Sequence, residues 1–439
     1  MSFALDVLVV GAGPAGIAAG SAAARSGKRV GVLDENPRPG GQIWRSGLHD
    51  RQRKPEAAKL RALDALKGSG ADLFSARQVV DAPSANRLTV WSDSTQTSET
   101  FVYKKLILAT GARERFLPFP GWTLPGVFGA GGLQALVRSG FEIRGKRVLV
   151  AGTGPLLLAV AAHLKEDGAQ VIAVAEQAPI NRLAAFSASL IGHPRKLAQA
   201  IQLKAALAGV PYRTGCWPTA AHGDDRVTAV SLKNGDRVWT EACDLLACGF
   251  HLVPNTELAS LLGCEIGTNG VVVDINQQTS VPDVHCAGES TGIAGVDSAQ
   301  VQGQIAGLAA AGQLTEAARL HRRRDAEGRI GKAMDRAFAL RPDILKLAEP
   351  DTIVCRCEDV RMRDLQRQAN KHSVWTDVKL QTRCGMGPCQ GRICGPALEA
   401  IFGWHNASVR PPIFPVPLET FCCQRPDPQV EPADPAMHG

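Results

Sequence analysis

Five cysteines stand close together near the C-terminus of this 439-residue chain, and their thiols could bind a metal. Cys355-x-Cys357 is one close pair, and Cys389-x4-Cys394 is another. A 2Fe-2S cluster takes four thiolates, which two such pairs supply once the fold brings them together. Cys384 could also pair with Cys389 at the same x4 spacing. Zinc and plain structural thiols are the alternatives, although Cys-x-Cys is cramped for zinc.

The ligand choice rests on a resemblance. The segment resembles the module of bacterioferritin-associated ferredoxin, in which a Cys-x-Cys pair is followed at a distance by a second pair. Residues 382–394 also look like the module of anaerobic glycerol-3-phosphate dehydrogenase, where the Cys384 position need not hold cysteine. The resemblance implies that the cluster ligands are Cys355, Cys357, Cys389 and Cys394. Cys384 is then the spare, a fifth cysteine that does not bind the cluster. Between the pairs, Glu358 to Leu365 has the pattern of a capped amphipathic helix that could fold the chain back.

A glycine fingerprint follows the first apolar run, 5–10, and opens an alanine-rich helix that stops at Gly27. The fingerprint residues are Gly11, Ala12, Gly13, Pro14, Ala15 and Gly16. This pattern permits a tight turn, a close approach of pyrophosphate, and packing of helix on strand. The second strand, 28–33, ends in Asp34 and Glu35, and Asp34 is the expected ligand of the adenosine ribose.

Three later segments resemble motifs of flavoproteins with two dinucleotide-binding domains, and they occur in the same order. They are the turn 39–42, the strand end 106–111 and the late motif 279–289. The resemblance assigns further FAD contacts to Gly41, Gln42, Ala109, Thr110, Gly111, Gly288 and Glu289. Glu289 stands where the family usually has Asp, whose carboxylate meets the ribitol chain.

A second, altered unit lies between these segments. A strand at 147–151 leads into Gly152-Thr153-Gly154-Pro155-Leu156-Leu157, where Leu157 replaces the packing glycine. A branched side chain there would push helix from strand, so NAD(P) binding in this unit is doubtful. Glu176 would suit NAD better than NADP if a nucleotide binds.

The expected fold class is α/β, a glutathione-reductase-like flavoprotein plus a small helical 2Fe-2S domain. The expected parts are an FAD domain from 1–117 and 244–315, a second Rossmann-like domain 118–243, a helical connector 316–350, a 2Fe-2S domain 351–404 and an extended tail 405–439. The tail is expected to be extended because prolines between Pro411 and Pro417 prevent a regular helix.

Composition excludes several classes of protein. The net charge is +7, but the basic residues are dispersed, and the chain has only two tyrosines and few aromatic residues overall to stack on bases, so nucleic-acid binding is not expected. No apolar run is long enough for a membrane span. The apolar start lacks a basic leader and is interrupted by Pro14, so we do not expect it to be a signal peptide. Twelve cysteines without an export signal favour the cytoplasm.

Taken whole, residues 7–417 resemble the alpha subunits of heteromeric amine dehydrogenases, the group of opine oxidase, D-hydroxyproline dehydrogenase, hydrogen cyanide synthase and sarcosine oxidase. The resemblance implies a flavin and iron-sulfur oxidoreductase subunit that relays electrons. The partner would be a beta-type, FAD-containing subunit of the amino-acid-oxidase type that oxidises a secondary amine, imino acid or opine. It also implies FMN at a subunit interface and a small further ferredoxin-like subunit.

This chain offers no candidate substrate base, and we expect no catalytic residue in it. His251 and His285 flank apolar strand ends and suit structural roles. The absence of Cys-x-x-Cys disfavours disulfide reduction. Two alternatives remain: a standalone NAD(P)H-dependent reductase, and a nucleotide-binding assembly protein without enzymatic activity.

Overall fold

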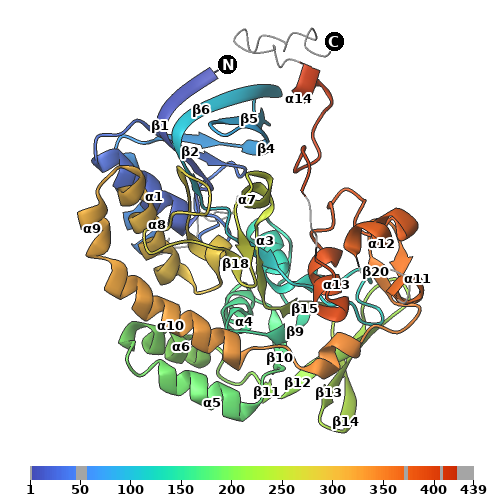
Figure 1. Ribbon diagram of the computed structural model, residues 1–439. Coiled ribbons are helices and arrows are strands. Elements are labelled where there is room, and N and C mark those ends of the chain that lie inside the picture. The colour runs from blue at the N-terminus through green and yellow to red at the C-terminus, as the bar shows by residue number, and fades with distance from the viewer. Residues whose placement is uncertain (1, 46–56, 370–373, 406–408, 423–439) are drawn as a thin grey trace, which may run out of the picture.

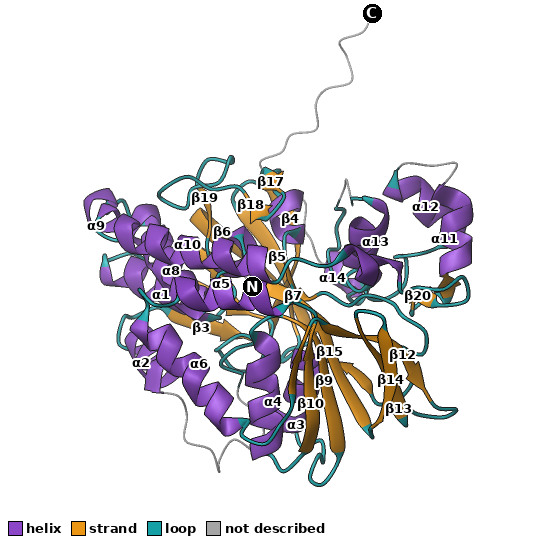
Figure 2. Ribbon diagram, turned by 90° about the horizontal axis from the view of Figure 1, so that it is seen from below, coloured by secondary structure: helices purple, strands orange, loops and turns teal. Residues whose placement is uncertain are grey.

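The structure is a computed structural model that describes residues 2–45, 57–369, 374–405 and 409–422. Two β-sheets flanked by helices make up most of the molecule, and a small helical unit lies at one side (Figure 1, Figure 2). The class is therefore α/β, as the sequence predicts. Within the described ranges, no helix is long and apolar enough to cross a membrane.

The first sheet carries the strand that leads into the glycine fingerprint. Its order is β3-β2-β1-β6-β5-β4, with β19 beside β6. The bounds are β1 Ser2–Val10, β2 Val30–Asp34, β3 Asp72–Ser75, β4 Arg77–Ser84, β5 Arg87–Ser92, β6 Thr97–Leu108 and β19 Val284–Cys286. Leu8 and Val9 in β1 are fully buried, because the parallel part of the sheet is covered on both faces.

Helix α1 (Pro14–Arg25), which follows the fingerprint, packs tightly on α8 (Val296–Ala310). A Cβ on Gly303 would lie 2.1 Å from the Ala15 carbonyl oxygen, and one on Gly307 would lie 2.2 Å from that of Ala19. The two backbones therefore touch, which fixes the N-terminus of α1 in place. Helix α2 (Ala57–Lys67) also packs against α1.

The second sheet is parallel and has the order β11-β10-β9-β15-β8. Its strands are β8 Val127–Gly129, β9 Arg147–Thr153, β10 Gln170–Glu176, β11 Tyr212–Thr214 and β15 Leu245–Phe250. Its helices are α3 Ala130–Arg138, α4 Leu156–Glu166, α5 Ile180–Ser189 and α6 Pro194–Ala206. An antiparallel sheet follows: β12 Cys216–His222, β13 Ala229–Asn234 and β14 Arg237–Ala242.

The return to the first sheet comes later than the sequence suggests. The FAD block was expected to resume at 244, but β15 pairs with β9 and β8, so the second sheet extends to Phe250. The two crossing segments then pair with each other, as β7 (Ala112–Glu114) and β16 (Leu252–Pro254). Short elements complete this block: α7 Glu257–Leu261, β17 Ile266–Gly267, β18 Gly270–Val271 and the 3-10 helix η2 Gly288–Thr291.

The connector is helical and reaches the second domain (Figure 1). It consists of α9 Leu314–Ala318, α10 His321–Ala337 and the 3-10 helix η3 Pro342–Lys346. The basic run 321–324 opens α10. Because α10 packs against both α8 and α5, the connector ties the two sheet domains together.

The C-terminal unit has its own small core around Leu365, Val378 and Leu398. Its elements are β20 Ile353–Cys355, β21 Val360–Arg361, α11 Met362–Ala369, α12 Trp375–Thr382 and α13 Cys394–Phe402. The helix expected from Glu358 begins only at Met362, because the chain first forms β21 against β20.

The described part of the tail has no regular helix over 409–418, and it is docked on the first sheet. Ile413 donates its N–H to the Val80 carbonyl at 2.9 Å and is buried in the core of the first sheet. A short helix, α14 (Glu419–Cys422), follows it beside that sheet (Figure 1). The rest of the predicted tail, 423–439, lies outside the described residues.

Candidate functional site

The fingerprint forms a turn in which two glycines have no room for a side chain. A Cβ on Gly11 would lie 2.2 Å from the Ala109 carbonyl oxygen, and one on Gly16 would lie 1.7 Å from that of Gly11. Gly13 faces outward, and a Cβ there would meet only the Cα of Gly41, at 3.8 Å. The turn and the positive end of α1 together form a cradle that fits a pyrophosphate.

Of the two acidic residues at the end of β2, Asp34 is the one that contacts the fingerprint. Its carboxylate accepts the Ala12 N–H at 2.6 Å and the Asn36 N–H at 2.7 Å, and the side chain is buried. Glu35 is exposed. The geometry thus favours Asp34 as the residue that would meet an adenosine ribose.

The glycine turn after β2 closes over the fingerprint. Gly40 donates its N–H to the Ala12 carbonyl at 2.8 Å, and a Cβ on Gly41 would lie 2.9 Å from the Gly13 Cα. Gln42 is exposed at the end of this turn. The two loops expected to hold FAD pyrophosphate are therefore neighbours.

The remaining expected FAD contacts also gather here. They are Ala109, Thr110 and Gly111 after β6, and Gly288 and Glu289 in η2. The Thr110 and Ser290 hydroxyls lie 3.0 Å apart, and a Cβ on Gly288 would lie 2.8 Å from that of Ala15 at the start of α1. Burial raises the pKa of the Glu289 carboxyl. The segments that carry the expected FAD contacts therefore meet at one cradle, and the residues present there fit the group.

Asn255 joins these segments and was not expected from the sequence. The Asn255 side-chain NH₂ donates to the Thr110 backbone carbonyl at 2.9 Å. The Asn255 backbone carbonyl accepts the Thr110 hydroxyl at 2.8 Å. Its N–H donates to the Gly111 carbonyl at 2.9 Å. An asparagine just after a short strand carries no signal that reveals such a contact.

The second unit has a different loop. Gly154 has a φ of +109°, whereas the corresponding Gly13 has a φ of −76°. Helix α4 begins at Leu156, with Pro155 as its cap, and the Leu157 side chain is buried in the core between α4 and its sheet. The leucine is therefore accommodated by a changed loop and a later helix start.

The acidic residue of the second unit serves its own loop. Glu176 is completely buried, and its carboxylate accepts the Gly154 N–H at 2.8 Å and the Thr153 hydroxyl at 2.7 Å. Burial raises the pKa of Glu176 to about 7. This carboxylate therefore accepts an N–H of its own loop, as the Asp34 carboxylate does in the first unit.

The connector covers the same strand end. The Gln177 amide donates to the Phe338 and Ala339 carbonyls at 3.5 and 3.2 Å, and its oxygen accepts the Arg341 N–H at 3.2 Å. Phe338 also packs on Ala178. These contacts place the chain's own backbone over the end of β10.

The cysteines form two groups that touch. The Cys355, Cys384 and Cys394 sulfurs lie within 4.8 Å of one another, and all three residues are buried. Cys357 is exposed, Cys389 is half-buried, and their thiols are hydrogen-bonded to each other. Five thiols, more than the four that a 2Fe-2S cluster takes, therefore meet in one place.

Glycines bring the two cysteine segments together. The Gly385 N–H donates to the Cys355 sulfur at 3.5 Å, with Gly385 itself at a φ of +81°. A Cβ on Gly387 would lie 2.3 Å from the Cys357 Cβ. The loop between α12 and α13 thus rests directly on the Cys-x-Cys turn.

Hydrogen bonds from Cys384, and next from Cys394, lower the pKa of Cys355 to about 2. The same contacts raise the pKa of Cys384, so this thiol keeps its proton when Cys355 is ionised. Cys384, the expected spare, is thus in direct contact with two expected ligands. Its x4 spacing to Cys389 was the only signal for it in the sequence.

Two family matches cover most of the chain. Residues 5–305 match the pyridine nucleotide-disulphide oxidoreductase family. Residues 353–404 match the BFD-like [2Fe-2S] binding domain, which contains all five cysteines.

Individual proteins agree with these matches. Hydrogen cyanide synthase subunit HcnB from Pseudomonas protegens is 31% identical over 95% of this chain and 97% of its own length. An opine oxidase subunit from Agrobacterium tumefaciens is 32% identical over 92% of this chain and 87% of its own. The crystal structure of L-proline dehydrogenase from P. horikoshii superposes with a TM-score of 0.68 and 16% identity, covering 96% of this chain and 80% of that one.

Proposed function

Because the chain belongs to the pyridine nucleotide-disulphide oxidoreductase family and ends in a BFD-like [2Fe-2S] domain, we propose that it is the electron-relay subunit of a heteromeric dehydrogenase. Both relatives, from hydrogen cyanide synthase and from opine oxidase, are named as subunits and match nearly the whole chain. The observation that carries the proposal is the presence, in one chain, of an FAD cradle and a five-thiol site.

FAD supplies two-electron chemistry and the cluster supplies one-electron chemistry. Asp34 would hold the ribose and Glu289 the ribitol chain. The residues proposed to line the rest of the FAD site are Gly11, Gly13, Pro14, Ala15, Gly16, Glu35, Gly41, Gln42, Ala109, Thr110, Gly111 and Gly288. Cys355, Cys357, Cys389 and Cys394 would hold the cluster, and Cys384 lies against Cys355 and Cys394.

The substrate chemistry belongs to a partner. We propose a beta-type flavoprotein subunit that oxidises a secondary amine, imino acid or opine, a class suggested by the name of one relative. His285 is buried with its pKa lowered to about 4 by burial, and burial also lowers the pKa of His251. Neither histidine is placed as a substrate base. A cytoplasmic location, FMN at the subunit interface and a small ferredoxin-like subunit remain predictions. All ten cysteines whose side chains are described are free, which suits a reducing compartment.

The competing function is a standalone NAD(P)H-dependent reductase. The altered loop and the connector over the end of β10 both disfavour it. A standalone reductase would be reduced by NAD(P)H, whereas the relay subunit would be reduced by the amine substrate through its partner.

The test is anaerobic reduction of the full chain alone and of the complex purified with its partner. NADH or NADPH should leave the isolated chain oxidised, while one compound from a panel of imino acids, opines and glycine derivatives should reduce the complex. Rapid bleaching of the isolated chain by NADH would contradict the relay proposal. Unchanged turnover of a complex in which this chain carries Cys355→Ser would favour a purely structural role.

A further inference from the structure

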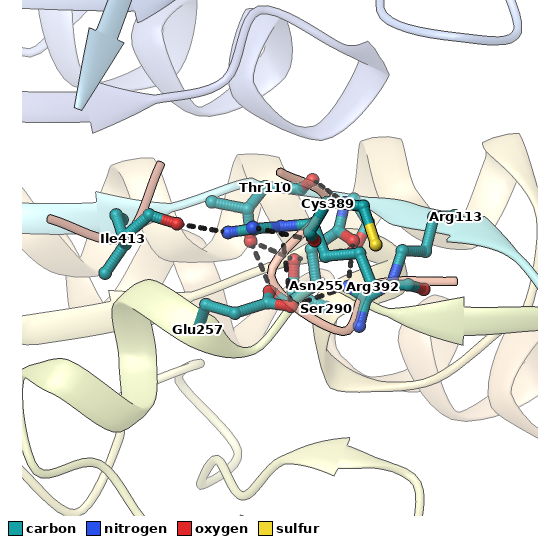
Figure 3. Close-up of polar contacts among 9 residues, drawn as sticks. Thr110, Arg113, Asn255, Glu257, Ser290, Cys389, Arg392 and Ile413 are labelled. Atoms are coloured by element: carbon teal, nitrogen blue, oxygen red, sulfur yellow. Dashed lines mark hydrogen bonds and ion pairs between the residues drawn. The ribbon is translucent and has the colours of Figure 1, made fainter. Parts of the chain in front are cut away.

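One side chain of the cluster loop reaches out of its own domain. Arg392 stands between Cys389 and Cys394, and its guanidinium donates to the Ile413 carbonyl of the docked tail. It also lies 4.0 Å from the centre of the Phe414 ring and donates weakly to the Cys389 carbonyl at 3.5 Å. Figure 3 shows this guanidinium between the tail, the cluster loop and the first domain.

A carboxylate of the first domain meets this guanidinium. Glu257, at the start of α7, lies 3.9 Å from Arg392 and 2.9 Å from Arg113 in β7. Arg113 in turn donates to the Arg392 carbonyl at 3.2 Å. Two arginines therefore share the Glu257 carboxylate, and the Glu35 carboxylate also interacts electrostatically with Arg392.

The same cluster of charges reaches the FAD motifs. Arg113 donates to the Asn255 side-chain oxygen at 2.7 Å, and Asn255 donates to the Thr110 carbonyl at 2.9 Å. Thr110 also bonds Ser290 in η2. An unbroken chain of polar contacts thus runs from the FAD motifs to the backbone of Cys389 (Figure 3).

These contacts are sheltered from solvent. The side chains of Arg392, Glu257 and Arg113 are 16%, 20% and 23% exposed. Ion pairs on an open surface contribute little, whereas partly buried, hydrogen-bonded pairs are screened less and hold their partners in a fixed geometry. The group is therefore suited to fixing the position of the cluster loop.

We infer that Arg392 is a positioning residue that docks the cluster loop on the FAD-binding segments and places a positive charge beside Cys389. The inference rests on the proposed electron relay. In the step concerned, the reduced flavin loses one electron and the oxidised cluster gains it, and no bond to Arg392 forms or breaks. The nearby cation favours the reduced cluster, which carries one more negative charge.

The test uses the full chain loaded with FAD and cluster, in four variants. In Arg392→Gln, cluster reduction after flash photoreduction of the flavin should slow roughly 10- to 100-fold, and the cluster potential should become more negative. Arg392→Lys keeps the charge without the fork of donors, so its potential should stay near wild type while the rate falls. Glu257→Gln should also slow the transfer. Arg367→Gln is the matched control, because Arg367 is exposed in the same domain and pairs only weakly with Asp364.

Loaded Arg392→Gln with a wild-type rate and potential would overturn the inference. If this variant binds no iron, Glu257→Gln decides, since it lies outside the cluster domain, and unchanged transfer there would equally overturn it. A wild-type chain in which the reduced flavin never reduces the cluster would instead contradict the proposed function itself.

Discussion

The two dinucleotide-binding units of this chain differ in how their loops are built. In the first, Gly16 leaves no space for a Cβ and α1 starts at Pro14, so the helix end lies close to the loop. In the second, Leu157 fills the corresponding position, and α4 starts one position later in the motif. The backbone conformation of Gly154 also differs from that of Gly13. The first loop forms a cradle, whereas in the second unit a buried leucine packs between the helix and the sheet.

The surroundings of the two acidic residues differ as well. Asp34 and Glu176 are both buried and each accepts an N–H of its own loop, but Gln177, the neighbour of Glu176, is hydrogen-bonded to the connector. A glycine pattern after a strand therefore does not by itself make a nucleotide site. The residues that cover the strand end decide whether a ligand can reach it.

The largest effect is expected from a side chain placed in the first fingerprint. Gly16→Ala puts a Cβ within 1.7 Å of the Gly11 carbonyl oxygen, so we expect loss of bound FAD. Leu157→Ala should instead cost about 3 kcal/mol of stability by leaving a cavity, with FAD retained. FAD content and chemical unfolding of both variants measure the contrast. Normal FAD binding by Gly16→Ala would contradict it.

The cysteines allow a similar contrast between a ligand and its neighbour. Cys355→Ser should abolish cluster assembly, because a four-thiolate set would lose a member. Cys384→Ser should keep its iron and acid-labile sulfide and alter only the spectrum of the cluster. Iron loss from the Cys384 variant as complete as that from the Cys355 variant would show that Cys384 is a ligand.

A smaller effect is expected from the acidic residues. Asp34→Asn should weaken FAD binding by roughly tenfold, since a hydrogen bond to a charged group contributes about 1.5 kcal/mol or more. Glu176→Gln should leave FAD affinity unchanged. Titration of the FAD-free chains with FAD separates the two, and equal weakening in both variants would argue against distinct roles.

The smallest effect concerns pH. Burial raises the pKa of Glu176 from 4.5 to about 7, so between these values the folded chain holds a proton that the unfolded chain has released. The tighter proton binding of the folded chain stabilises it at low pH. The free energy of unfolding therefore falls as pH rises between these two values, by up to about 1.4 kcal/mol per pH unit. Glu176→Gln should flatten that dependence in denaturant unfolding. An identical slope in wild type and variant would contradict the assignment.

The sequence predicts the parts of the site that depend on short segments. The turn at Gly11 and the choice of Asp34 follow from local sterics and spacing, and the structure places both at one cradle. The two cysteine pairs can likewise be recognised from their short spacing in the sequence.

Contacts between distant segments could not be predicted in this way. Asn255, Glu257 and Arg392 are ordinary polar residues whose partners lie far away in sequence, so no periodicity marks them. The docking of Ile413 and the place of β15 in the second sheet likewise depend on tertiary packing.

A flavin and an iron-sulfur cluster in one chain are central to the proposed relay. Their most direct test is the FAD, iron and acid-labile sulfide content of the full chain purified without oxygen. We predict one FAD with the two irons and two sulfides of a 2Fe-2S cluster. A chain that has no flavin absorbance, and carries zinc or no metal on its cysteines, would contradict the relay.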